Sequence, residues 1–453
     1  MKQHLNDDQL VLLVIKFMKE HKKKELDLLL DELHPYDIAN IYEKLPEKHK
    51  TRLLLLLNNH LLADVIQELN HHSQIDVLNR LGVDKKGKVL DLMDNDDLAS
   101  MLKELSPEVI NHLLSGMKKE ESTIVQNIMN YPEESAGRLM TNRFVWIRDT
   151  YTVREAVDKL KSFAEFAETI NYLYVINEEK KLVGVVSYRD LLLADINELI
   201  KNIMYERVIS VSAYADQEEA ARLIERYDFL AIPVVDENNV LTGIVTVDDI
   251  VDVIIREANE DIEKLSASGK SIDFETKALV AAGRRLPWLI LLLIIGVISG
   301  SIISVFEETL DKVVALAFFM PMIAGMTGNT GTQSLAVVVR GLASKDLDKK
   351  AIIKLILREF GVGLIIGITC GLLISAIAYI WQGGNFYLGF VVGASLFFTL
   401  IIGTLAGTII PIILYRLKID PAIASGPLIT TLNDIFSLFI YFSLASIFIS
   451  YLT

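Results

Sequence analysis

The sequence predicts a multidomain fold: an all-α superhelical N-domain, an α/β domain made of two copies of one unit, and an α-helical membrane bundle of five transmembrane helices. Three observations predict it. Apolar residues recur at helical spacing in the first 135 residues, one strand–turn–strand pattern occurs twice after them, and long apolar stretches dominate the chain from residue 286. The boundaries that we predict are 1–135, 136–255, a connecting (plug) helix at 256–285 and a membrane domain at 286–453.

The charge of the chain is unevenly distributed. The formal net charge is −14, but the part from residue 286 onward holds nine Lys/Arg and eight Asp/Glu, so residues 1–285 carry a net charge of −15. Such an acidic part argues against nucleic acid or anionic lipid as its ligand and favours cations or basic partners. For most individual acids, a solvated surface that aids solubility remains the alternative.

Helix breaks divide residues 1–135 into short helices. They fall at His34-Pro35, Leu45-Pro46, Asn95-Asp96 and Ser106-Pro107, where Pro, Asn, Asp or Ser can cap a helix or begin its first turn. A loose, recurring unit of Leu, a cap residue, an acid and an apolar residue suggests stacked helical hairpins.

Residues 136–255 contain two segments with one layout: an acidic helix, a strand, a polar turn, a second strand and a helix. The apolar runs 173–176 and 231–235 are typical of strands buried on both faces. Each copy ends in Gly, two apolar residues, a hydroxyl residue and Asp three positions later: Ser187 with Asp190, and Thr246 with Asp249. A hydroxyl and a carboxylate at such a junction can cap the helix or hold a ribose and phosphate. The paired signature resembles a tandem CBS domain, whose cleft often binds an adenosine nucleotide; a structural pair with an empty cleft is the alternative.

Five stretches can cross a membrane, at 286–306, 312–342, 351–381, 387–414 and 423–452, since a helix needs about 20 apolar residues to do so. Basic residues gather on one side of the predicted bundle: Arg284, Arg285, Arg340, Lys345, Lys349, Lys350, Lys354, Arg358, Arg416 and Lys418. The positive-inside rule then places the N-terminal domains in the cytoplasm and the C-terminus outside. The N-terminus lacks the pattern of a signal peptide, in line with this orientation.

The second stretch contains the segment PMIAGMTGNTGTQS, rich in glycine and polar residues. We expect Pro321, Gly325, Gly328, Asn329 and Gly331 to interrupt the helix at membrane depth. Small residues also permit close helix packing, which suffices to explain Gly367 and Gly371. It does not explain Asn329 and Gln333, whose amides need polar surroundings.

Asp434 lies inside the fifth stretch, with no basic residue nearby in the sequence. An ionised carboxylate at the centre of a bilayer costs about 2.5–3.5 kcal/mol on insertion scales. We therefore expect Asp434 to face the interior of the bundle, near Thr430, Thr431 and Asn433. A cation site and a structural hydrogen bond to another helix are the two explanations.

The sequence resembles the MgtE family of magnesium channels along essentially the whole chain. The segments that carry the resemblance are PMIAGMTGNTGTQS, DPAIASGPLITTLNDI and YPEESAGRLMT. The resemblance implies a homodimer in the lipid membrane, with a pore between the two copies and a magnesium-binding carboxylate at Asp434. It implies Mg²⁺ uptake that cytosolic Mg²⁺ shuts off. The affinity of Mg²⁺ for oxygen ligands, and its reluctance to lose water, fit a paired-carboxylate site.

The resemblance also implies regulatory sites in the soluble part. The matching acids are Asp64 and Asp96 in the N-domain, Asp216, Glu218, Asp228, Asp249 and Asp252 in the CBS pair, and Glu257, Glu260 and Asp261 in the connecting helix. Ser100 stands where some members have a carboxylate, which puts one N-domain site in doubt. Tyr172, Arg189, Phe229 and Asp249 match positions that contact ATP, and Asp190 is a further candidate.

Other functions remain as alternatives. The ion could be another divalent cation such as Co²⁺ or Mn²⁺, or the chain could be a CBS-type membrane sensor that conducts nothing. A CBS-regulated chloride channel is not favoured, because it predicts more spans and CBS copies at the C-terminus, and this chain shows the reverse order. We expect no enzyme, because the sequence shows no Ser/His/Asp set, P-loop or zinc spacing.

Overall fold

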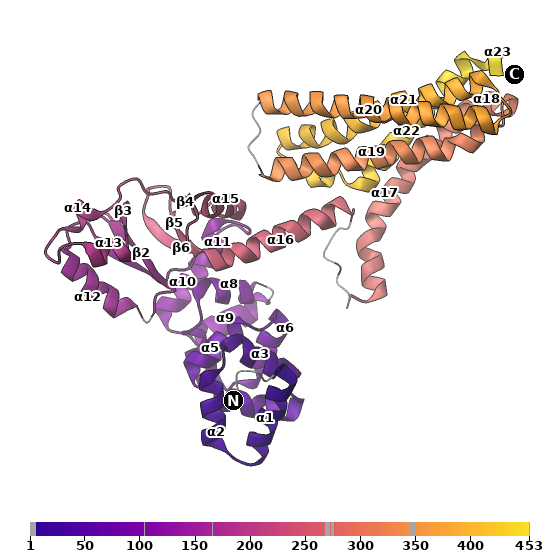
Figure 1. Ribbon diagram of the computed structural model, residues 1–453. Helices are drawn as coiled ribbons and strands as arrows, with labels where there is room; N and C mark the ends of the chain where they lie inside the picture. The colour runs from indigo at the N-terminus through magenta and orange to yellow at the C-terminus, as the bar shows by residue number, and fades with distance from the viewer. Residues whose placement is uncertain are drawn as a thin grey trace. The chain divides into compact units, whose positions relative to one another are not determined.

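The computed structural model describes residues 6–103, 105–164, 166–267, 272, 276–344 and 349–452. The chain divides into two compact units, Met1–Ile254 and Ile255–Thr453, and each is described by itself (Figure 1). Two sequence predictions fall on residues outside those described. These are Lys345, one of the basic residues used for orientation, and the part of the predicted connector at 268–271 and 273–275.

The first unit begins with short helices: α1 (Asp7–Lys19), α2 (Lys23–Glu32), α3 (Pro35–Lys44), α4 (Glu47–Leu56), α5 (Asn59–Gln67), α6 (His71–Arg80), α7 (Val83–Leu90), α8 (Asn95–Leu102), α9 (Pro107–Ser115) and α10 (Lys119–Met129). The predicted breaks are confirmed. Helices α3 and α9 begin at Pro35 and Pro107, where a missing N–H is tolerated, and His34 caps α3 by accepting from the Tyr36 amide. Helix α1 packs on α3, α3 on α5 and α5 on α7, as in a helical superhelix.

Two α/β repeats follow. The first holds α11 (Ala136–Leu139), β1 (Phe144–Arg148), α12 (Val153–Phe163), β2 (Thr169–Ile176), β3 (Leu182–Ser187) and α13 (Tyr188–Leu193). The second holds α14 (Ile200–Ile203), β4 (Val211–Ser212), α15 (Gln217–Tyr227), β5 (Ala231–Val235), β6 (Leu241–Thr246) and α16 (Val247–Leu265). Their sheets have the orders β1-β2-β3 and β4-β5-β6, each with a parallel pair and then an antiparallel pair. The predicted duplication is therefore confirmed.

Both signature pairs lie at a junction between a strand and a helix, as predicted. The Ser187 hydroxyl donates to Asp190 Oδ2 at 2.6 Å and accepts from the Asp190 amide, so it caps α13. The Thr246 hydroxyl donates to Asp249 Oδ2 at 2.5 Å at the start of α16. The register pairs Tyr172 with Ser187 and Ala231 with Thr246, which gives the two repeats equivalent frameworks.

One hydrophobic core joins the helical domain to the second repeat. It runs from Leu10 in α1 to Ile128 in α10 and continues through Ala136 and Met140 to Ile232 and Val253. A second core, which includes the fully buried Val145 and Leu173, fills the first repeat. The helical domain and the second repeat therefore share buried surface, and removal of that surface from water stabilises their contact by about 25 cal/mol per Å² of apolar area.

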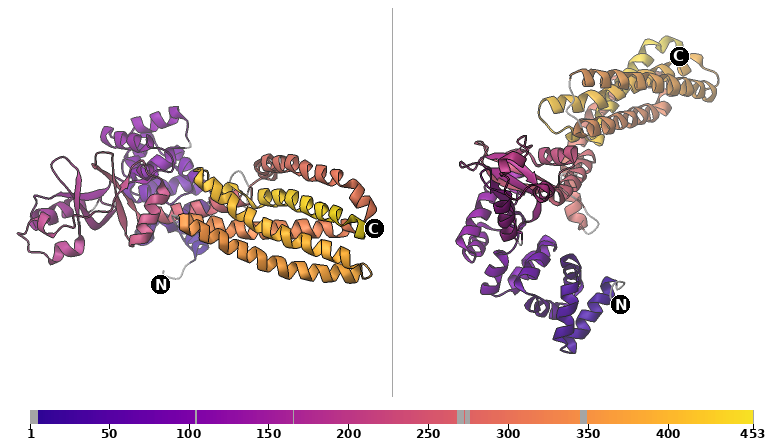
Figure 2. Two further views of the ribbon diagram at one scale, coloured as in Figure 1. Left: turned by 90° about the horizontal axis from the view of Figure 1, so that it is seen from above. Right: turned by 60° about the vertical axis from the view of Figure 1, so that its left-hand side comes forward.

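The second unit contains the C-terminal part of α16 and long helices that lie alongside one another (Figure 2): α17 (Ala278–Val305), α19 (Leu316–Ser344), α20 (Lys349–Trp381), α21 (Phe386–Arg416) and α22 (Gly426–Ile447). The short helices α18 (Glu307–Lys312) and α23 (Ile449–Leu452) and the 3₁₀ helix η1 (Pro421–Ile423) complete it. Among the described residues, four helices are long and apolar enough to cross a membrane, namely α17, α20, α21 and α22. Helix α19, with 29 residues, is also long enough, but its polar segment lowers its hydropathy. These are the five stretches predicted from the sequence.

The predicted interruption of the second stretch is wrong. Helix α19 is continuous from Leu316 to Ser344, with Pro321 inside it. Its glycines instead allow close packing: a Cβ at Gly328 would lie 2.7 Å from Thr430 Cγ2 of α22, and one at Gly331 would meet the Asn433 amide. Glycine has no side chain but keeps its backbone N–H, so α19 can retain its helical hydrogen bonds at these positions. The absence of side chains lets the neighbouring helices pack closely against α19 and hold it as one helix.

Packing by small residues, predicted for Gly367 and Gly371 of α20, is confirmed. A Cβ at Gly371 would lie 2.8 Å from the Gly393 carbonyl oxygen of α21, and one at Gly367 would lie 2.9 Å from the Phe397 carbonyl oxygen. The backbones of α20 and α21 therefore approach closely, in the way that membrane helices often associate.

Candidate functional site

The first unit holds a cluster of carboxylates at the junction of its helical and CBS parts. Asp96 and Asp97 come from the first turn of α8, Asp248 and Asp249 from the first turn of α16, and Glu168 directly precedes β2. Single carboxylate oxygens of Glu168, Asp248 and Asp249 all lie within 4.8 Å of one another. We call these five residues the acid cluster.

Burial and mutual repulsion raise the pKa values of four members of the acid cluster, Asp96, Asp97, Glu168 and Asp249. Burial, and then the charge of Asp249, raise the pKa of Asp97 to about 7 and that of Glu168 to about 8. The pKa of Asp96 lies well above its ordinary value for the same two reasons. Burial raises the pKa of Asp249 to about 6, although the Thr246 hydroxyl opposes the rise. The cluster therefore gains stability from a bound proton or a bound cation.

A hard divalent cation fits this donor set. Asp96 is 7% exposed, and its Oδ1 atom has no hydrogen-bond partner among the described residues. An oxygen atom buried without a partner costs about 1–3 kcal/mol, more if it is charged, so its position calls for a ligand. Carboxylate oxygens are the donors that Mg²⁺ and Ca²⁺ prefer.

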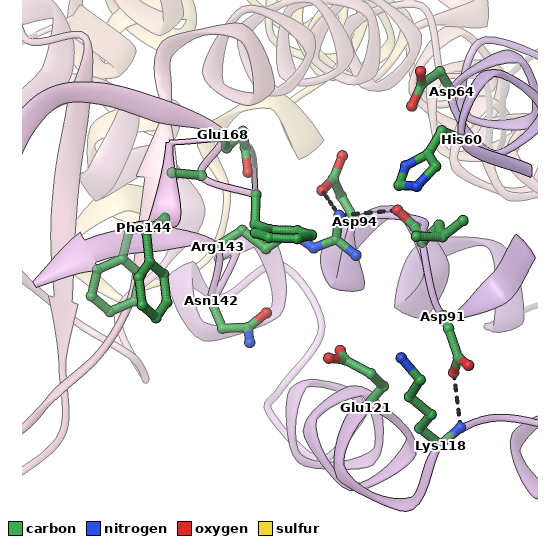
Figure 3. Close-up of a pocket in the computed structure, with 14 residues that line it drawn as sticks. His60, Asp64, Asp91, Asp94, Lys118, Glu121, Asn142, Arg143, Phe144 and Glu168 are labelled. Atoms are coloured by element: carbon green, nitrogen blue, oxygen red, sulfur yellow. Dashed lines mark hydrogen bonds and ion pairs between the residues drawn. The ribbon is translucent and has the colours of Figure 1, made fainter. Parts of the chain in front are cut away.

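Asp64 belongs to a cavity beside the cluster. The cavity has a volume of about 590 Å³, and Asp64, Asp91, Asp94, Glu121 and Glu168 contribute its acidic lining (Figure 3). Partial burial and the charge of Asp94 raise the pKa of Asp64, while His60 and then Arg143 oppose the rise. Asp252, one turn beyond Asp249, adds to the negative field on the cluster.

The other predicted acids of the CBS pair, Asp216, Glu218 and Asp228, do not come together in one site within a single chain. Asp216 caps the start of α15 by accepting from the Glu218 amide at 2.8 Å. Asp228 ends the same helix in the left-handed conformation, with φ at +53°. A helix rises 1.5 Å per residue, so these ends lie about 18 Å apart.

The predicted acids of the connecting helix lie at the end of α16, in the second unit. Glu260 accepts from Lys264 Nζ at 2.5 Å, and Lys264 also contacts Asp420 Oδ2 at 2.6 Å. Partial burial and the charge of Asp420 raise the pKa of Asp261. Glu257 lies one turn before Asp261 and is half-buried. Asp420, which the sequence analysis did not single out, thus joins Glu260 and Asp261.

Asp434 lies in the middle of α22, and its side chain is half-buried. No described residue donates a hydrogen bond to its carboxylate or forms an ion pair with it. The preceding residue, Asn433, is fully buried and donates from Nδ2 to the Thr327 carbonyl of α19 at 3.3 Å, while its Oδ1 atom has no described partner. Two consecutive residues of one membrane helix therefore each carry a side-chain oxygen without a described partner.

A second cavity, of about 360 Å³, lies between the two CBS repeats. Tyr172, Arg189, Asp190 and Phe229, four of the five residues predicted to bind nucleotide, line it. The rings of Tyr172 and Phe229 stand edge to face, with centroids 6.5 Å apart. Asp249, the fifth, is not among the lining residues and lies in the acid cluster instead, whereas Arg207 adds a cation that the sequence analysis missed.

Several residues of these sites escaped the sequence analysis. Asp97 and Asp248 each adjoin a predicted acid, and the runs DNDD and VDD could have indicated them. Glu168, Asp420 and Arg143 do not adjoin any predicted site residue in the sequence. Only the tertiary fold brings them to the carboxylates, so no local pattern could have found them.

The architecture defines a class: a membrane protein with several spans whose soluble module combines a helical domain, a CBS pair and a carboxylate cluster. The model of the MgtE divalent cation transporter matches residues 320–444, that of the MgtE intracellular N domain matches 33–134, and that of the CBS domain matches 136–197 and 200–256. The magnesium transporter MgtE of Bacillus subtilis is 61% identical to this chain over 99% of both chains. The chain belongs to the MgtE family.

Two relatives with lower sequence identity are also similar along almost the whole chain. The magnesium transporter MgtE of Enterococcus faecalis is 41% identical over 97% of both chains, and that of Thermus thermophilus is 37% identical over 97% of this chain and 98% of the relative. All three relatives are named magnesium transporters.

Two solved structures are similar to the soluble part. One, the soluble part of a magnesium transporter, has a TM-score of 0.54 and 38% identity and covers 56% of this chain and all of that one. The other, the cytosolic domain of the Mg²⁺ channel MgtE in complex with ATP, has a TM-score of 0.51 and 35% identity, covering 54% of this chain and 99% of that one.

Proposed function

We propose that this protein is a Mg²⁺ channel that takes up magnesium across the cell membrane and is closed by cytosolic Mg²⁺. The observation that carries the proposal is Asp434, a carboxylate in the middle of a membrane helix without a described partner. An intramembrane acid of this kind is a functional site by default, because its burial costs free energy that a structural role would recover through a partner. Mg²⁺ keeps several of its waters, so few protein oxygens suffice to hold it.

The exposed face of α19 supports a pore formed by two chains. Gly325, Asn329 and Gln333 are exposed and recur at four-residue spacing, so they lie on one face of the helix. Amides exposed on a membrane helix require water or another protein surface. A homodimer with this face and Asp434 at its axis meets that requirement and pairs two carboxylates around the ion.

The acid cluster supports regulation by the transported ion. At low cytosolic Mg²⁺, Asp96, Asp97 and Asp249 repel one another; bound Mg²⁺ would neutralise them and favour the closed state. Asp64, Asp216, Glu218, Asp228, Asp252, Glu257, Glu260 and Asp261 are assigned to regulatory sites on family resemblance. An ion shifts such an equilibrium only by its difference in affinity between the two states.

ATP fits the second cavity. The Tyr172 and Phe229 rings would contact the base, Asp190 would accept from the ribose hydroxyls, and Arg189 and Arg207 would bind phosphates. The related cytosolic domain solved with ATP supports this assignment. We also propose that residues 1–255 are cytoplasmic and the C-terminus is outside, with the domain boundaries predicted from the sequence.

The test is a flux assay in liposomes with Mg²⁺, Ca²⁺, Mn²⁺ and Co²⁺, comparing the wild type with Asp434→Ala. We expect the variant to lose Mg²⁺ flux, whereas Asp311→Ala, which removes an exposed acid of α18, keeps it. Unaltered flux in Asp434→Ala would overturn the pore assignment and favour a non-conducting sensor. A preference for Co²⁺ or Mn²⁺ would favour a transporter of another divalent ion.

The regulatory part is tested separately. Asp97→Asn combined with Asp249→Asn should leave the maximal flux intact and raise the internal Mg²⁺ concentration needed for inhibition. Deletion of residues 1–130 should likewise weaken the inhibition. If inhibition by internal Mg²⁺ were unchanged in both, the acid cluster would not be the sensor.

A further inference from the structure

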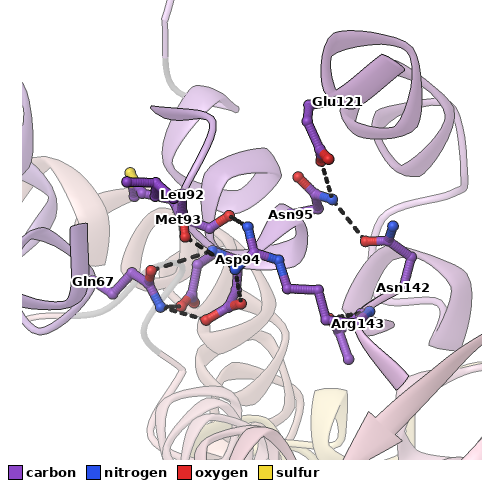
Figure 4. A network of polar contacts seen from close by, with 10 residues as sticks. Gln67, Leu92, Met93, Asp94, Asn95, Glu121, Asn142 and Arg143 are labelled. Carbon is purple, nitrogen blue, oxygen red and sulfur yellow. Dashed lines mark hydrogen bonds and ion pairs between the residues drawn. The ribbon is translucent and has the colours of Figure 1, made fainter. Parts of the chain in front are cut away.

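Arg143 places a guanidinium group among the carboxylates beside the acid cluster. The residue immediately precedes β1, and its side chain reaches across to the turn between α7 and α8 (Figure 4). There Nη1 donates to the Leu92 carbonyl at 3.0 Å, Nη2 donates to the Met93 carbonyl at 2.6 Å, and Nη1 lies 3.1 Å from Asp94 Oδ1. The side chain is 21% exposed, so the contacts are largely shielded from water.

The neighbouring residue forms a second connection between the same elements. Asn95 of α8 donates from Nδ2 to Asn142 Oδ1 at 2.7 Å and to Glu121 Oε2 at 3.2 Å. The Arg143 carbonyl accepts from the Glu168 amide at 2.9 Å. The segment 142–143 therefore links the helical domain, the first CBS repeat and a member of the acid cluster.

The groups around Arg143 are those that otherwise attract a metal ion. The Leu92 and Met93 carbonyls follow the C-terminal end of α7, where the helix dipole is negative. Asp94 adds a carboxylate, whose Oδ1 atom lies 3.1 Å from Arg143 Nη1. Gln67 donates to both Asp94 and Asp97, at 2.8 and 2.9 Å, and so connects this group to the acid cluster.

We propose that the Arg143 guanidinium occupies a latent divalent-cation site formed by Asp94 and the Leu92 and Met93 carbonyls, and acts there as a permanent internal counter-ion. Because arginine stays charged at every physiological pH, this part of the contact between the helical domain and the CBS pair is independent of Mg²⁺. The inference deepens the proposed function and rests on its regulatory part, because it assigns a fixed cation to this contact and leaves Mg²⁺ sensing to the acid cluster and the other regulatory acids.

The test is equilibrium binding of Mn²⁺, as a paramagnetic probe, to the full-length protein in detergent, with free Mn²⁺ measured by electron paramagnetic resonance. We expect Arg143→Gln to bind one more Mn²⁺ per chain than the wild type. Arg143→Lys keeps the charge and should bind the wild-type number. Arg143→Gln combined with Asp94→Asn removes a ligand of the latent site and should lose the additional ion.

Thermal unfolding provides the second measurement. In EDTA, Arg143→Gln should have a lower Tm than the wild type, and Mn²⁺ should remove that difference; Arg154→Gln, which changes an exposed arginine of α12, should unfold like the wild type throughout. Equal Mn²⁺ numbers in Arg143→Gln and the wild type would overturn the proposal. So would a Tm difference that Mn²⁺ leaves unchanged, or an additional ion that persists in the double variant. None of these results depends on flux through Asp434.

Discussion

Lys264 and Asp420 form an ion pair that joins the end of α16 to the segment before α22: Lys264 Nζ lies 2.6 Å from Asp420 Oδ2. The other carboxylate oxygen of Asp420 accepts from the Ala422 amide at 2.8 Å and so holds the start of η1. Although partial burial opposes it, hydrogen bonds with Asp420 and Glu260 raise the pKa of Lys264, which therefore stays charged. Leu265, the last residue of α16, packs beside it against Ala422, Ala424 and Ile429.

Substitution of Lys264 by Gln should loosen the end of α16. The ion pairs are about one-third exposed, so their loss is expected to cost about 1 kcal/mol, equivalent to roughly fivefold faster exchange through local opening. Hydrogen–deuterium exchange of residues 255–267 in the full-length protein measures this. Lys277→Gln, at an exposed position before α17, is the control, and equal exchange in the two variants would contradict the prediction.

Stability without divalent ions should fall as the pH rises from 6 to 8. The folded pKa values of Asp249, Asp97 and Glu168, about 6, 7 and 8, lie above their ordinary values of 3.8 to 4.5. The folded state thus binds more protons than the unfolded state between these limits. Its stabilisation by these groups is complete below about pH 4 and is lost as the pH rises through the folded values.

The measurement is the Tm of the full-length protein in EDTA and in Mg²⁺ across this pH range. Mg²⁺ replaces the protons, so we expect it to raise the Tm more at pH 8 than at pH 6. Asp97→Asn combined with Asp249→Asn should show a weaker dependence on pH. A Tm in EDTA that rises from pH 6 to pH 8 would contradict the assignment.

Substitution of Gly407 by Ala should destabilise the membrane bundle. An added Cβ would collide with the Gly331 carbonyl of α19, a backbone atom that cannot turn aside. Overpacking of this kind typically costs about 1–3 kcal/mol. Gly361→Ala in α20 is the matched control, because a Cβ there meets no described atom within 4 Å. Thermal unfolding in detergent should separate the two, and equal Tm values would refute the packing argument.

The signature aspartates should differ in their effect on ATP binding. Asp190 lines the cavity between the CBS repeats, whereas Asp249 lies in the acid cluster. Loss of a charged hydrogen-bond acceptor costs about 1.5–3 kcal/mol, so Asp190→Asn should weaken ATP binding by roughly tenfold or more. Asp249→Asn should weaken it little. Isothermal titration in EDTA tests this, and the opposite order would place the nucleotide in another cleft.

The sequence predicted the features that short-range rules control. Pro35 and Pro107 begin helices, and β5 coincides with the predicted run 231–235, because local backbone preferences and a continuous apolar run decide these elements. Strand β2 begins four residues earlier than predicted, at Thr169. Its first residues are not a continuous apolar run, and their strand conformation depends on pairing with Phe144 of β1.

Tertiary contacts decide the remaining features. The glycines of α19 indicated an interrupted helix, but close approach of α21 and α22 makes those same glycines favourable within a continuous one. Glu168 joins Asp249 from 81 positions away in the sequence, and Arg143 reaches Asp94 from 49 positions away. Neither pairing follows from spacing, since the first depends on how the two CBS repeats pack together and the second on how the helical domain packs on them.

The glycine contacts among α19, α21 and α22 also limit how the proposed pore can move. Gly328 and Gly331 adjoin α22, while Gly403 and Gly407 of α21 adjoin the α19 backbone, so a sliding motion between these helices would bring backbone atoms into collision. The carboxylate of Asp434 is thus carried by α22, whose position relative to α19 and α21 is fixed by these contacts. Discrimination between a hydrated Mg²⁺ ion and a larger one would then rest on a preset distance between rigid surfaces, with gating left to parts outside these three helices.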